Sequence, residues 1–233
     1  RVALLRELNR NDAAAEPIAL RGHEGKIQGV AFSPDGRWLA THGLEDETAR
    51  LWDLSHEDPG AEPIVLRGHQ GRVESTFSPD GHWLVTYGSR DETARLWDLR
   101  SDNPLDKPTL VRLLRGHEST VDAVAFSPDG RWLATHGSRD KMVRLWDLDR
   151  GAQVAEAIVF GGHERYVKSV AFAPGGRWLV TGSRDEAARV WDLESGRELC
   201  RVRPELDEGV YAVGFSHDGE RLAVGFGART SVS

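Results

Sequence analysis

Short apolar runs separated by polar turns fill the stretch from Leu114 to Leu148 and the segment after it. Apolar and polar or small residues alternate along Val121–Phe126, and short apolar-rich runs cover Trp132–Thr135 and Val143–Asp147. A further apolar run, Ile158–Phe160, follows a polar connection. Such runs, bounded by turn residues, predict β-strands that bury one face. The stretch therefore predicts four short antiparallel strands, which we label a to d in chain order.

The turn between the first two of these strands is written Ser-Pro-Asp-Gly at residues 127–130. Proline presets φ, and aspartate and glycine favour the remaining turn positions. The same turn recurs as Ser-Pro-Asp-Gly at 33–36 and 78–81, Ala-Pro-Gly-Gly at 173–176 and Ser-His-Asp-Gly at 216–219. The chain therefore contains a repeated unit, and a unit of this size has a sheet that cannot cover its own faces, so that neighbouring units must stack.

Two dipeptides mark the repeat at fixed places. Gly-His pairs end at His23, His69, His117 and His163, which lie 46, 48 and 46 residues apart. Trp-Asp pairs begin at Trp52, Trp97, Trp146 and Trp191. The other four of the eight tryptophans begin a Trp-Leu pair in each unit, at Trp38, Trp83, Trp132 and Trp178. A repeat of this length, with Gly-His near one end and Trp-Asp near the other, resembles the WD-repeat family of β-propellers.

The resemblance covers practically the whole chain and implies an all-β propeller of four-stranded antiparallel blades. We expect residues 1–233 to form one such domain or part of one, with complete repeats at 26–66, 72–114, 120–160 and 166–202. Residues 1–20 match strands c and d of a preceding blade, and 210–233 match the start of another. These ends admit two interpretations: a fragment of a larger ring, which we favour, or five blades if the two ends close together.

Two length differences between the repeats predict local backbone changes. Strand a of the second repeat, Val73–Phe77, is one residue shorter than its counterparts. A one-residue change flips side chains across a strand unless a bulge or loop absorbs it. Conversely, the first three repeats have one more residue than the fourth after the strand-b threonine, which predicts an extra bulge residue near their b–c turns.

Each repeat carries a histidine, a threonine, an aspartate and a tryptophan at corresponding positions. A Thr-His-Asp set invites comparison with a nucleophilic triad, but four equal copies favour a structural role. The resemblance implies a hydrogen-bond network in which Asp accepts from His, His bonds Thr, and Thr bonds the indole N–H. Its members are His23, Thr41, Asp46 and Trp52; His69, Thr86, Asp91 and Trp97; His117, Thr135, Asp140 and Trp146; His163, Thr181, Asp185 and Trp191.

Composition argues against several other classes of function. The formal net charge of −7 disfavours a general nucleic-acid binder, and no run approaches the roughly 20 apolar residues that cross a bilayer. No metal-binding spacing of His, Cys or Asp is present, so we expect no metal, no cofactor and no catalytic site. The single cysteine, Cys200, excludes an internal disulfide and favours a reducing, cytoplasmic location.

The resemblance implies that partners dock on the d–a and b–c loops. The matching residues are Glu24, Lys26, Gln70, Arg72, Glu118, Thr120, Glu164 and Tyr166 in the d–a loops, and Glu45, Arg90, Arg139 and Arg184 in the b–c turns. Three arginines in equivalent turns would form an arc, and arginine forks suit carboxylates and phosphates. An acidic or phosphorylated peptide is therefore one hypothesis for the partner. Solvated turn residues are the simpler interpretation.

The expected function is a non-catalytic scaffold for protein–protein interaction. The near-identity of the repeats resembles the large bacterial WD-repeat proteins, so the alternative is a regulatory propeller of a multidomain signalling kinase, protease or NTPase. Open blade edges would add a tendency to self-associate. Both functions rest on family analogy, because a fold does not dictate a function.

Overall fold

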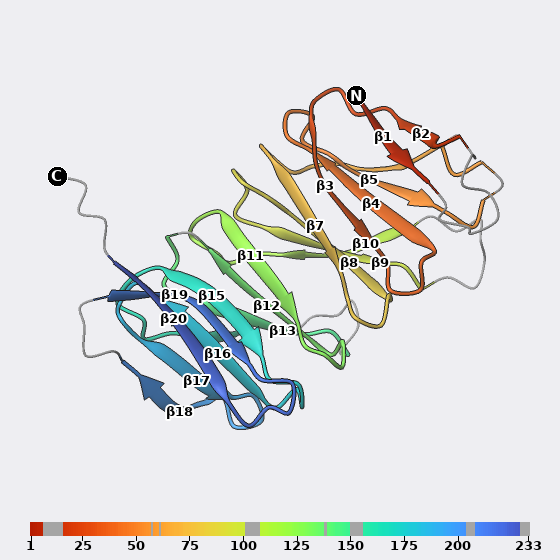
Figure 1. The fold of residues 1–233 in the computed structure, drawn as a ribbon. Helices are drawn as coiled ribbons and strands as arrows, with labels where there is room; N and C mark the ends of the chain where they lie inside the picture. Colours follow the sequence, from red (N-terminus) through yellow and green to blue (C-terminus); the bar gives the residue numbers. More distant parts are fainter. Residues whose placement is uncertain are drawn as a thin grey trace. The chain divides into compact units, whose positions relative to one another are not determined.

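The computed structural model describes residues 1–6, 16–56, 58–60, 62–100, 108–137, 139–149, 156–203 and 208–228. The remaining residues of the predicted repeats lie outside these ranges. Within them the chain forms β-strands and no helix (Figure 1). The chain divides into two compact units, Arg1–Leu114 and Arg115–Ser233, which we describe separately.

Ten strands lie in the described part of the first unit. They are β1 (Val2–Leu5), β2 (Ile18–Arg21), β3 (Ile27–Phe32), β4 (Trp38–Gly43), β5 (Ala49–Asp53), β6 (Ile64–Leu66), β7 (Val73–Phe77), β8 (Trp83–Gly88), β9 (Ala94–Asp98) and β10 (Thr109–Leu114). β3-β4-β5-β6 form one antiparallel sheet, blade 1, and β7-β8-β9-β10 form blade 2. β1 and β2 pair in a two-stranded sheet.

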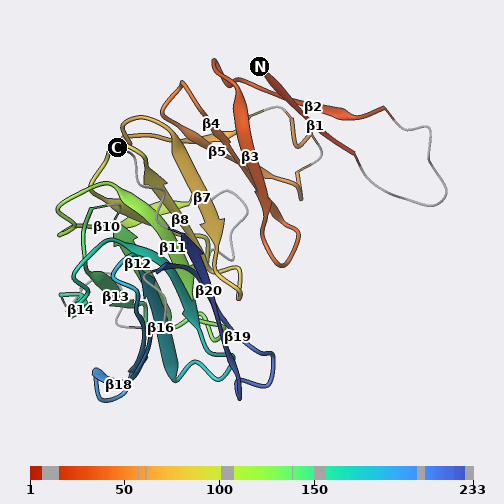
Figure 2. The ribbon, with the colours of Figure 1, turned by 60° about the vertical axis from the view of Figure 1, so that its left-hand side comes forward.

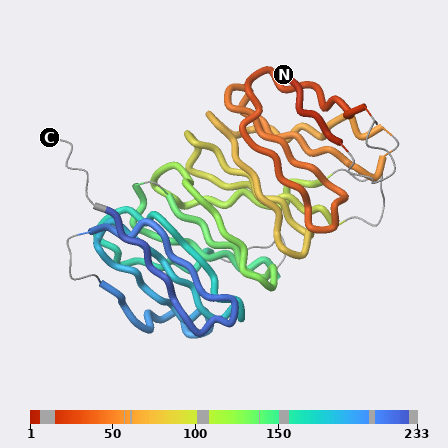
Figure 3. Tube along the Cα trace, in the orientation of Figure 1, coloured from red at the N-terminus to blue at the C-terminus, as the bar shows by residue number. Residues whose placement is uncertain are grey.

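The second unit contains the other ten strands. They are β11 (Val121–Phe126), β12 (Trp132–Gly137), β13 (Val143–Asp147), β14 (Ile158–Phe160), β15 (Val167–Phe172), β16 (Trp178–Ser183), β17 (Ala188–Asp192), β18 (Arg197–Val202), β19 (Glu208–Phe215) and β20 (Leu222–Ala228). β11 to β14 form blade 3, β15 to β18 form blade 4, and β19 pairs with β20 (Figure 3). The predicted all-β class with four-stranded antiparallel repeats is confirmed.

The repeated Ser-Pro-Asp-Gly turn closes the a–b hairpin in the way its sequence predicts. In blade 1 the Gly36 N–H donates to the Ser33 carbonyl at 2.9 Å, and Gly36 has a φ of 73°, which favours glycine. The Ser33 hydroxyl donates to Asp35, and the N–H of Trp38 donates to the Ser33 hydroxyl. The first bond orients the serine hydroxyl, and the second gives the backbone N–H of Trp38 a partner at the end of the turn.

Apolar faces of neighbouring sheets pack together within each unit. Figure 2 shows the strands of these sheets from a second side. In unit 1, Trp38 and Leu51 of blade 1 pack with Leu84 and Trp97 of blade 2. β1 and β2 contribute to a separate cluster around Trp52. In unit 2, blade 3 packs on blade 4, and blade 4 packs on the β19–β20 pair. Burial of each large apolar side chain contributes roughly 1.5–3 kcal/mol.

The shorter strand a of blade 2 has lost a bulge residue. In the other three blades the pairing of strands a and b shifts by one residue near the start of strand a, between Ile27 and Gly29, Val121 and Ala123, and Val167 and Ser169. In blade 2 the pairing from Val73 to Phe77 continues without a shift. The deletion therefore leaves the other side chains of β7 on their expected faces.

The extra residue of blades 1 and 2 lies in the b–c turn, which corrects the prediction of a bulge. The pairing of β4 with β5 is regular, as is that of β16 with β17. Turn positions can be matched by the N–H that donates to strand a. That donor is Leu44 in blade 1, Ser89 in blade 2 and Arg184 in blade 4. Arg184 therefore corresponds to Leu44 and Ser89, rather than to Glu45 and Arg90.

Candidate functional site

The predicted histidine network is present in all four blades with nearly identical geometry. The His Nδ1–Asp Oδ2 distances are 2.5, 2.6, 2.6 and 2.9 Å in blades 1 to 4. The His Nε2–Thr Oγ1 distances are 2.8, 2.8, 2.7 and 2.8 Å. The indole N–H donates to the same threonine oxygen at 3.0, 2.9, 3.0 and 3.0 Å. The network therefore includes all sixteen residues named from the sequence.

Donor and acceptor chemistry determines which atom carries each proton in this network. An indole N–H can only donate, so the threonine oxygen accepts from it. The threonine hydroxyl then has its one hydrogen available for His Nε2. In a neutral ring the remaining proton sits on Nδ1 and is donated to the aspartate, so that every polar atom along the chain of bonds has a partner.

Burial assigns this network to structure rather than to catalysis. The four threonines are 0% exposed, and their hydroxyls lie between a histidine and an indole. A nucleophile in this position could not reach a substrate. The network therefore shares only its residue types with a catalytic Thr-His-Asp triad. The network instead links strands b and c of a blade to the b–c turn and to the loop that precedes strand a.

The aspartates of the network have lowered pKa values. For Asp185, burial opposes ionisation, but hydrogen bonds from His163 and from the backbone N–H of Glu164 lower the pKa to about 2. Asp46, Asp91 and Asp140 have pKa values shifted in the same direction, where burial is again opposed mainly by the bond to histidine. The ionised carboxylate is therefore part of the folded blade.

Sequence reasoning missed a strand-c arginine that contacts the glycine of the Gly-His pair in three blades and the network aspartate in the other. In blades 1, 2 and 4 a strand-c arginine donates to the carbonyl of the glycine before the network histidine; these arginines are Arg50, Arg95 and Arg189. In blade 3, Arg144 instead pairs with Asp140 at 2.5 Å. The signal was visible, because an arginine stands two residues before each Trp of the Trp-Asp pairs.

The glycine of the Gly-His pair is required by this contact and by its backbone. Gly22 has a φ of 129°, and a Cβ built there would lie 2.9 Å from a guanidinium nitrogen of Arg50. Gly68 and Gly162 have comparable backbone angles and arginine contacts. A side chain at these positions would displace the arginine, which explains why the dipeptide begins with glycine.

The predicted partner face consists mostly of exposed residues on one edge of each blade, where the d–a loops and b–c turns lie. Ten of its twelve members are exposed; Arg72 and Thr120 are half-buried. Arg72 forms an ion pair with Glu74. Of the three arginines in the b–c turns, Arg90 belongs to unit 1, and Arg139 and Arg184 belong to unit 2.

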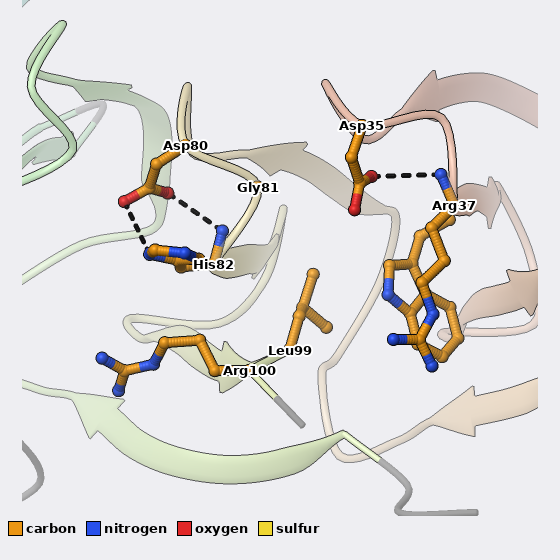
Figure 4. A pocket seen from close by; sticks show the side chains of 8 residues that line it. Asp35, Arg37, Asp80, Gly81, His82, Leu99 and Arg100 are labelled. Atoms are coloured by element: carbon orange, nitrogen blue, oxygen red, sulfur yellow. Dashed lines mark hydrogen bonds and ion pairs between the residues drawn. The ribbon is translucent and has the colours of Figure 1, made fainter. Parts of the chain in front are cut away.

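The opposite edge, which carries the a–b turns, has a polar depression between blades 1 and 2 (Figure 4). Its volume is about 300 Å³, and its lining comprises Asp35, Arg37, Trp38, Asp80, Gly81, His82, Leu99 and Arg100. The guanidinium of Arg37 lies 4.8 Å from the Trp38 ring. Arg100 pairs with Asp98 at 2.8 Å, and His82 with Asp80 at 3.1 Å. Most charged side chains that line the depression are therefore already paired with a neighbouring side chain.

A comparable depression of about 480 Å³ lies between blades 3 and 4 in unit 2, where Arg131 covers Trp132 in the same way. Among the described residues, no cluster of three or more His, Cys, Asp or Glu side chains could hold a metal ion. Nor do those residues form a helix that could span a bilayer. Neither depression offers a set of groups arranged for a reaction.

Comparison with protein families gives a match that coincides with these blades. The family profile described as "WD domain, G-beta repeat" matches residues 16–53, 60–98, 108–147 and 156–192. Together the four matches cover more than half of the chain. No curated protein sequence matches it. Four profile matches in register with four Asp-His-Thr-Trp networks show that the chain belongs to the WD40 repeat family.

Proposed function

We propose that the protein is a non-catalytic scaffold that binds another protein or peptide through the loops at the d–a and b–c edge of its blades. The observation that carries this proposal is the contrast between the two residue classes of a repeat. The network histidines, threonines and tryptophans are buried, the aspartates are buried or half-buried, and the same four residue types recur in every blade. Most of the loop residues beside them are exposed, and they differ from blade to blade, as at Lys26, Arg72, Thr120 and Tyr166, of which Arg72 and Thr120 are half-buried.

This contrast is what a recognition platform requires. The buried network holds each loop from below, because His and Asp belong to the two loops themselves. A loop held in place loses less conformational freedom when a partner binds, which improves affinity. Variation among the exposed residues then supplies different chemistry on a common backbone. Family membership supports the same function, because WD40 domains generally mediate protein–protein interactions.

A second candidate is a regulatory propeller attached to a signalling kinase, protease or NTPase. The near-identity of the repeats favours it, because the sequence resembles the large bacterial WD-repeat proteins in this respect. Under either candidate the chain acts by binding, and the partner is a protein. The regulatory function differs in that its partner would be an enzyme module of the same polypeptide, in a cytoplasmic signalling protein.

Site-specific photo-crosslinking tests the proposed surface. A photoreactive amino acid is placed singly at exposed positions of the d–a loops, Glu24, Gln70 and Glu164, and at exposed positions of the a–b turns, His82, Asp129 and His217. Extract of the source cells supplies the partner. We expect a common crosslinked protein from the loop set and none from the turn set. Crosslinks from the a–b turns alone would overturn the proposal.

A further inference from the structure

Two exposed tyrosines and one exposed arginine gather on the loop edge of unit 2. Tyr166 lies in the d–a loop before β15 and is 37% exposed, and Tyr211 lies in β19 and is 39% exposed. Arg184 lies in the b–c turn of blade 4 and is also exposed. Its guanidinium carbon is 5.7 Å from the centroid of the Tyr211 ring. Tyrosine and arginine are the residue types enriched where proteins bind one another.

The backbone places Arg184 in the middle of this group. The N–H of Arg184 donates to the carbonyl of Tyr166 at 3.0 Å, and the b–c turn of blade 4 is one residue shorter than in blades 1 and 2, where the same bond is made. Blades 1 and 2 have Leu44 and Ser89 at this position. The shorter turn therefore brings a cationic side chain to a position that is uncharged in unit 1.

Tyr211 is turned outward by a bulge and held by glycine. The pairing of β19 with β20 shifts between Val210 and Ala212, so that Tyr211 is the bulge residue, and a bulge redirects its side chain. A Cβ at Gly227 would lie 3.0 Å from the Tyr211 ring, and one at Gly209 would lie 3.2 Å from it. The ring thus rests on bare backbone, which restricts its orientation before any partner binds.

Arg184 has no carboxylate partner among the described residues. Other arginines of unit 2 do: Arg177 pairs with Asp192 at 3.0 Å, Arg189 with Glu198 at 2.6 Å, and Arg201 with Glu198 at 3.0 Å. The stacking of Arg184 on Tyr211 uses the face of the guanidinium and leaves its N–H fork available. A planar fork of this kind matches the two oxygens of a carboxylate.

We propose that Tyr166, Arg184 and Tyr211 form a binding site for an acidic peptide, in which a glutamate or aspartate carboxylate meets the Arg184 fork and apolar neighbours of that residue contact the two tyrosine rings. This deepens the proposed function and rests on it. The one guanidinium of this site, which has no carboxylate partner among the described residues, balances the single charge of a carboxylate, whereas a doubly charged phosphate would require further cations. The site therefore selects carboxylate over phosphate.

The test uses three sets of synthetic peptides and the whole chain. The first set contains one glutamate among neutral aliphatic residues, the second has glutamine in its place, and the third has phosphoserine. Equilibrium binding to the wild-type chain should occur with the glutamate set and be weaker with the other two. Equal binding of the glutamine set, or preferred binding of the phosphoserine set, would overturn the proposal.

Variants locate the binding. Arg184→Ala should weaken the best glutamate peptide at least about tenfold, as expected when a residue contributing over ~1.4 kcal/mol is truncated. Arg184→Lys should recover only part of this loss, and Tyr211→Phe should retain binding that Tyr211→Ala loses. The matched control is Arg197→Ala, which removes an exposed arginine from β18 and should change nothing. Circular dichroism confirms that each variant is folded.

The two proposals fail in different ways. If Arg184→Ala binds the glutamate peptides as the wild type does, this site is wrong, while loop-edge crosslinks would still support a scaffold. If partner crosslinks come only from the a–b turns, the proposed function is wrong, whatever the peptide result. No binding of any peptide set to the wild-type chain would also overturn the site.

Discussion

The interface between blades 1 and 2 in unit 1 differs from the interface between blades 3 and 4 in unit 2, and we call each of these interfaces a seam. Each seam contains a histidine with the same sequence neighbours. His42 and His136 both stand in a Thr-His-Gly sequence at the end of strand b, and both are buried. In unit 1 the His42 Nδ1 atom lies 3.1 Å from the Ser75 hydroxyl of β7. In unit 2 neither ring nitrogen of His136 has a hydrogen-bond partner among the described residues. The same tripeptide therefore has two environments.

The cause of the difference lies in strand a of the following blade. Ser75 is paired with the network residue Thr86, and Val170 is paired with Thr181, so Ser75 and Val170 occupy the same register position. At this position Ser75 offers a hydroxyl, whereas Val170 offers only methyl groups. The charged neighbours differ as well: Glu74 raises the pKa of His42 and Arg72 lowers it, whereas Lys168 lowers the pKa of His136 and Asp140 raises it. Inter-blade packing, rather than the repeat itself, decides the environment of each histidine.

The pKa values reflect this contrast. Burial lowers the pKa of His136 to about 4, with further lowering from His117 and Lys168. Burial also lowers the pKa of His42, but the Glu74 carboxylate opposes that shift. The unit 1 seam is thus better prepared to accept a proton than the unit 2 seam.

The largest expected loss of stability comes from breaking the histidine network, and it should be the same in both units. Thr86→Val in blade 2 and Thr181→Val in blade 4 each leave a buried histidine nitrogen and a buried indole N–H without a partner. Each should lower the free energy of unfolding by about 2–4 kcal/mol. Urea denaturation followed by circular dichroism measures both. A cost near zero in either blade would show that the network does not stabilise that blade.

The pH dependence of stability should separate the seams. The pKa of His136 is lower in the folded chain than the ordinary value of 6.5, so its contribution is complete above pH 6.5 and is lost as the pH falls toward 4. Between pH 7.5 and pH 5 this loss should be about 2 kcal/mol. His136→Leu should remove that part of the pH dependence. An unchanged dependence in the variant would contradict the assignment.

Replacing each seam histidine by leucine should give unequal results at neutral pH. His42→Leu removes a hydrogen bond and leaves Ser75 without this partner, which should cost about 1–2 kcal/mol. His136→Leu removes two unpartnered nitrogens and should be neutral or stabilising by up to about 1 kcal/mol. Chemical denaturation at pH 7.5 compares the two. Equal costs would mean that the Ser75 contact contributes nothing.

Exchanging Ser75 and Val170, the strand-a residues at the two seams, should change stability least. Ser75→Val should resemble the loss of one hydrogen bond, about 1 kcal/mol. Val170→Ser should change stability by less than about 1 kcal/mol, because a new bond to His136 offsets the lost methyl groups. A double-mutant cycle of Val170→Ser with His136→Leu isolates that bond. Zero coupling would show that the new hydroxyl does not reach the ring.

Much of this structure could be predicted from the sequence, because the same local patterns recur in every repeat. Alternating apolar runs gave the strands, Ser-Pro-Asp-Gly gave the a–b turns, and the spacing of His, Thr, Asp and Trp indicated the network. Each of these features is local or lies within one blade. The strand-c arginines were equally visible in the sequence, but no partner was assigned to them.

What the sequence did not reveal depends on contacts between blades or on backbone register. The missing bulge in β7 could be placed only once the pairing of Val73 with Gly88 was known. Arg184 was matched with Glu45 and Arg90 by counting back from the aspartate, and the hydrogen bond to Tyr166 shows otherwise. Tyr211 was not considered at all, because its outward direction comes from a bulge. Residues that recur were predictable, and residues that differ were not.

Hydrogen exchange of the tryptophan indole N–H groups, read from one nitrogen-15 NMR spectrum, tests the central claim that a closed network holds each blade. The network indoles of Trp52, Trp97, Trp146 and Trp191 donate to buried threonine oxygens. Those of Trp38, Trp83, Trp132 and Trp178 serve as internal controls. The account predicts that each of the four signals from the first set exchanges more slowly than all four from the second, including those of Trp38 and Trp83, which are buried as well. Equal rates in both sets would contradict it.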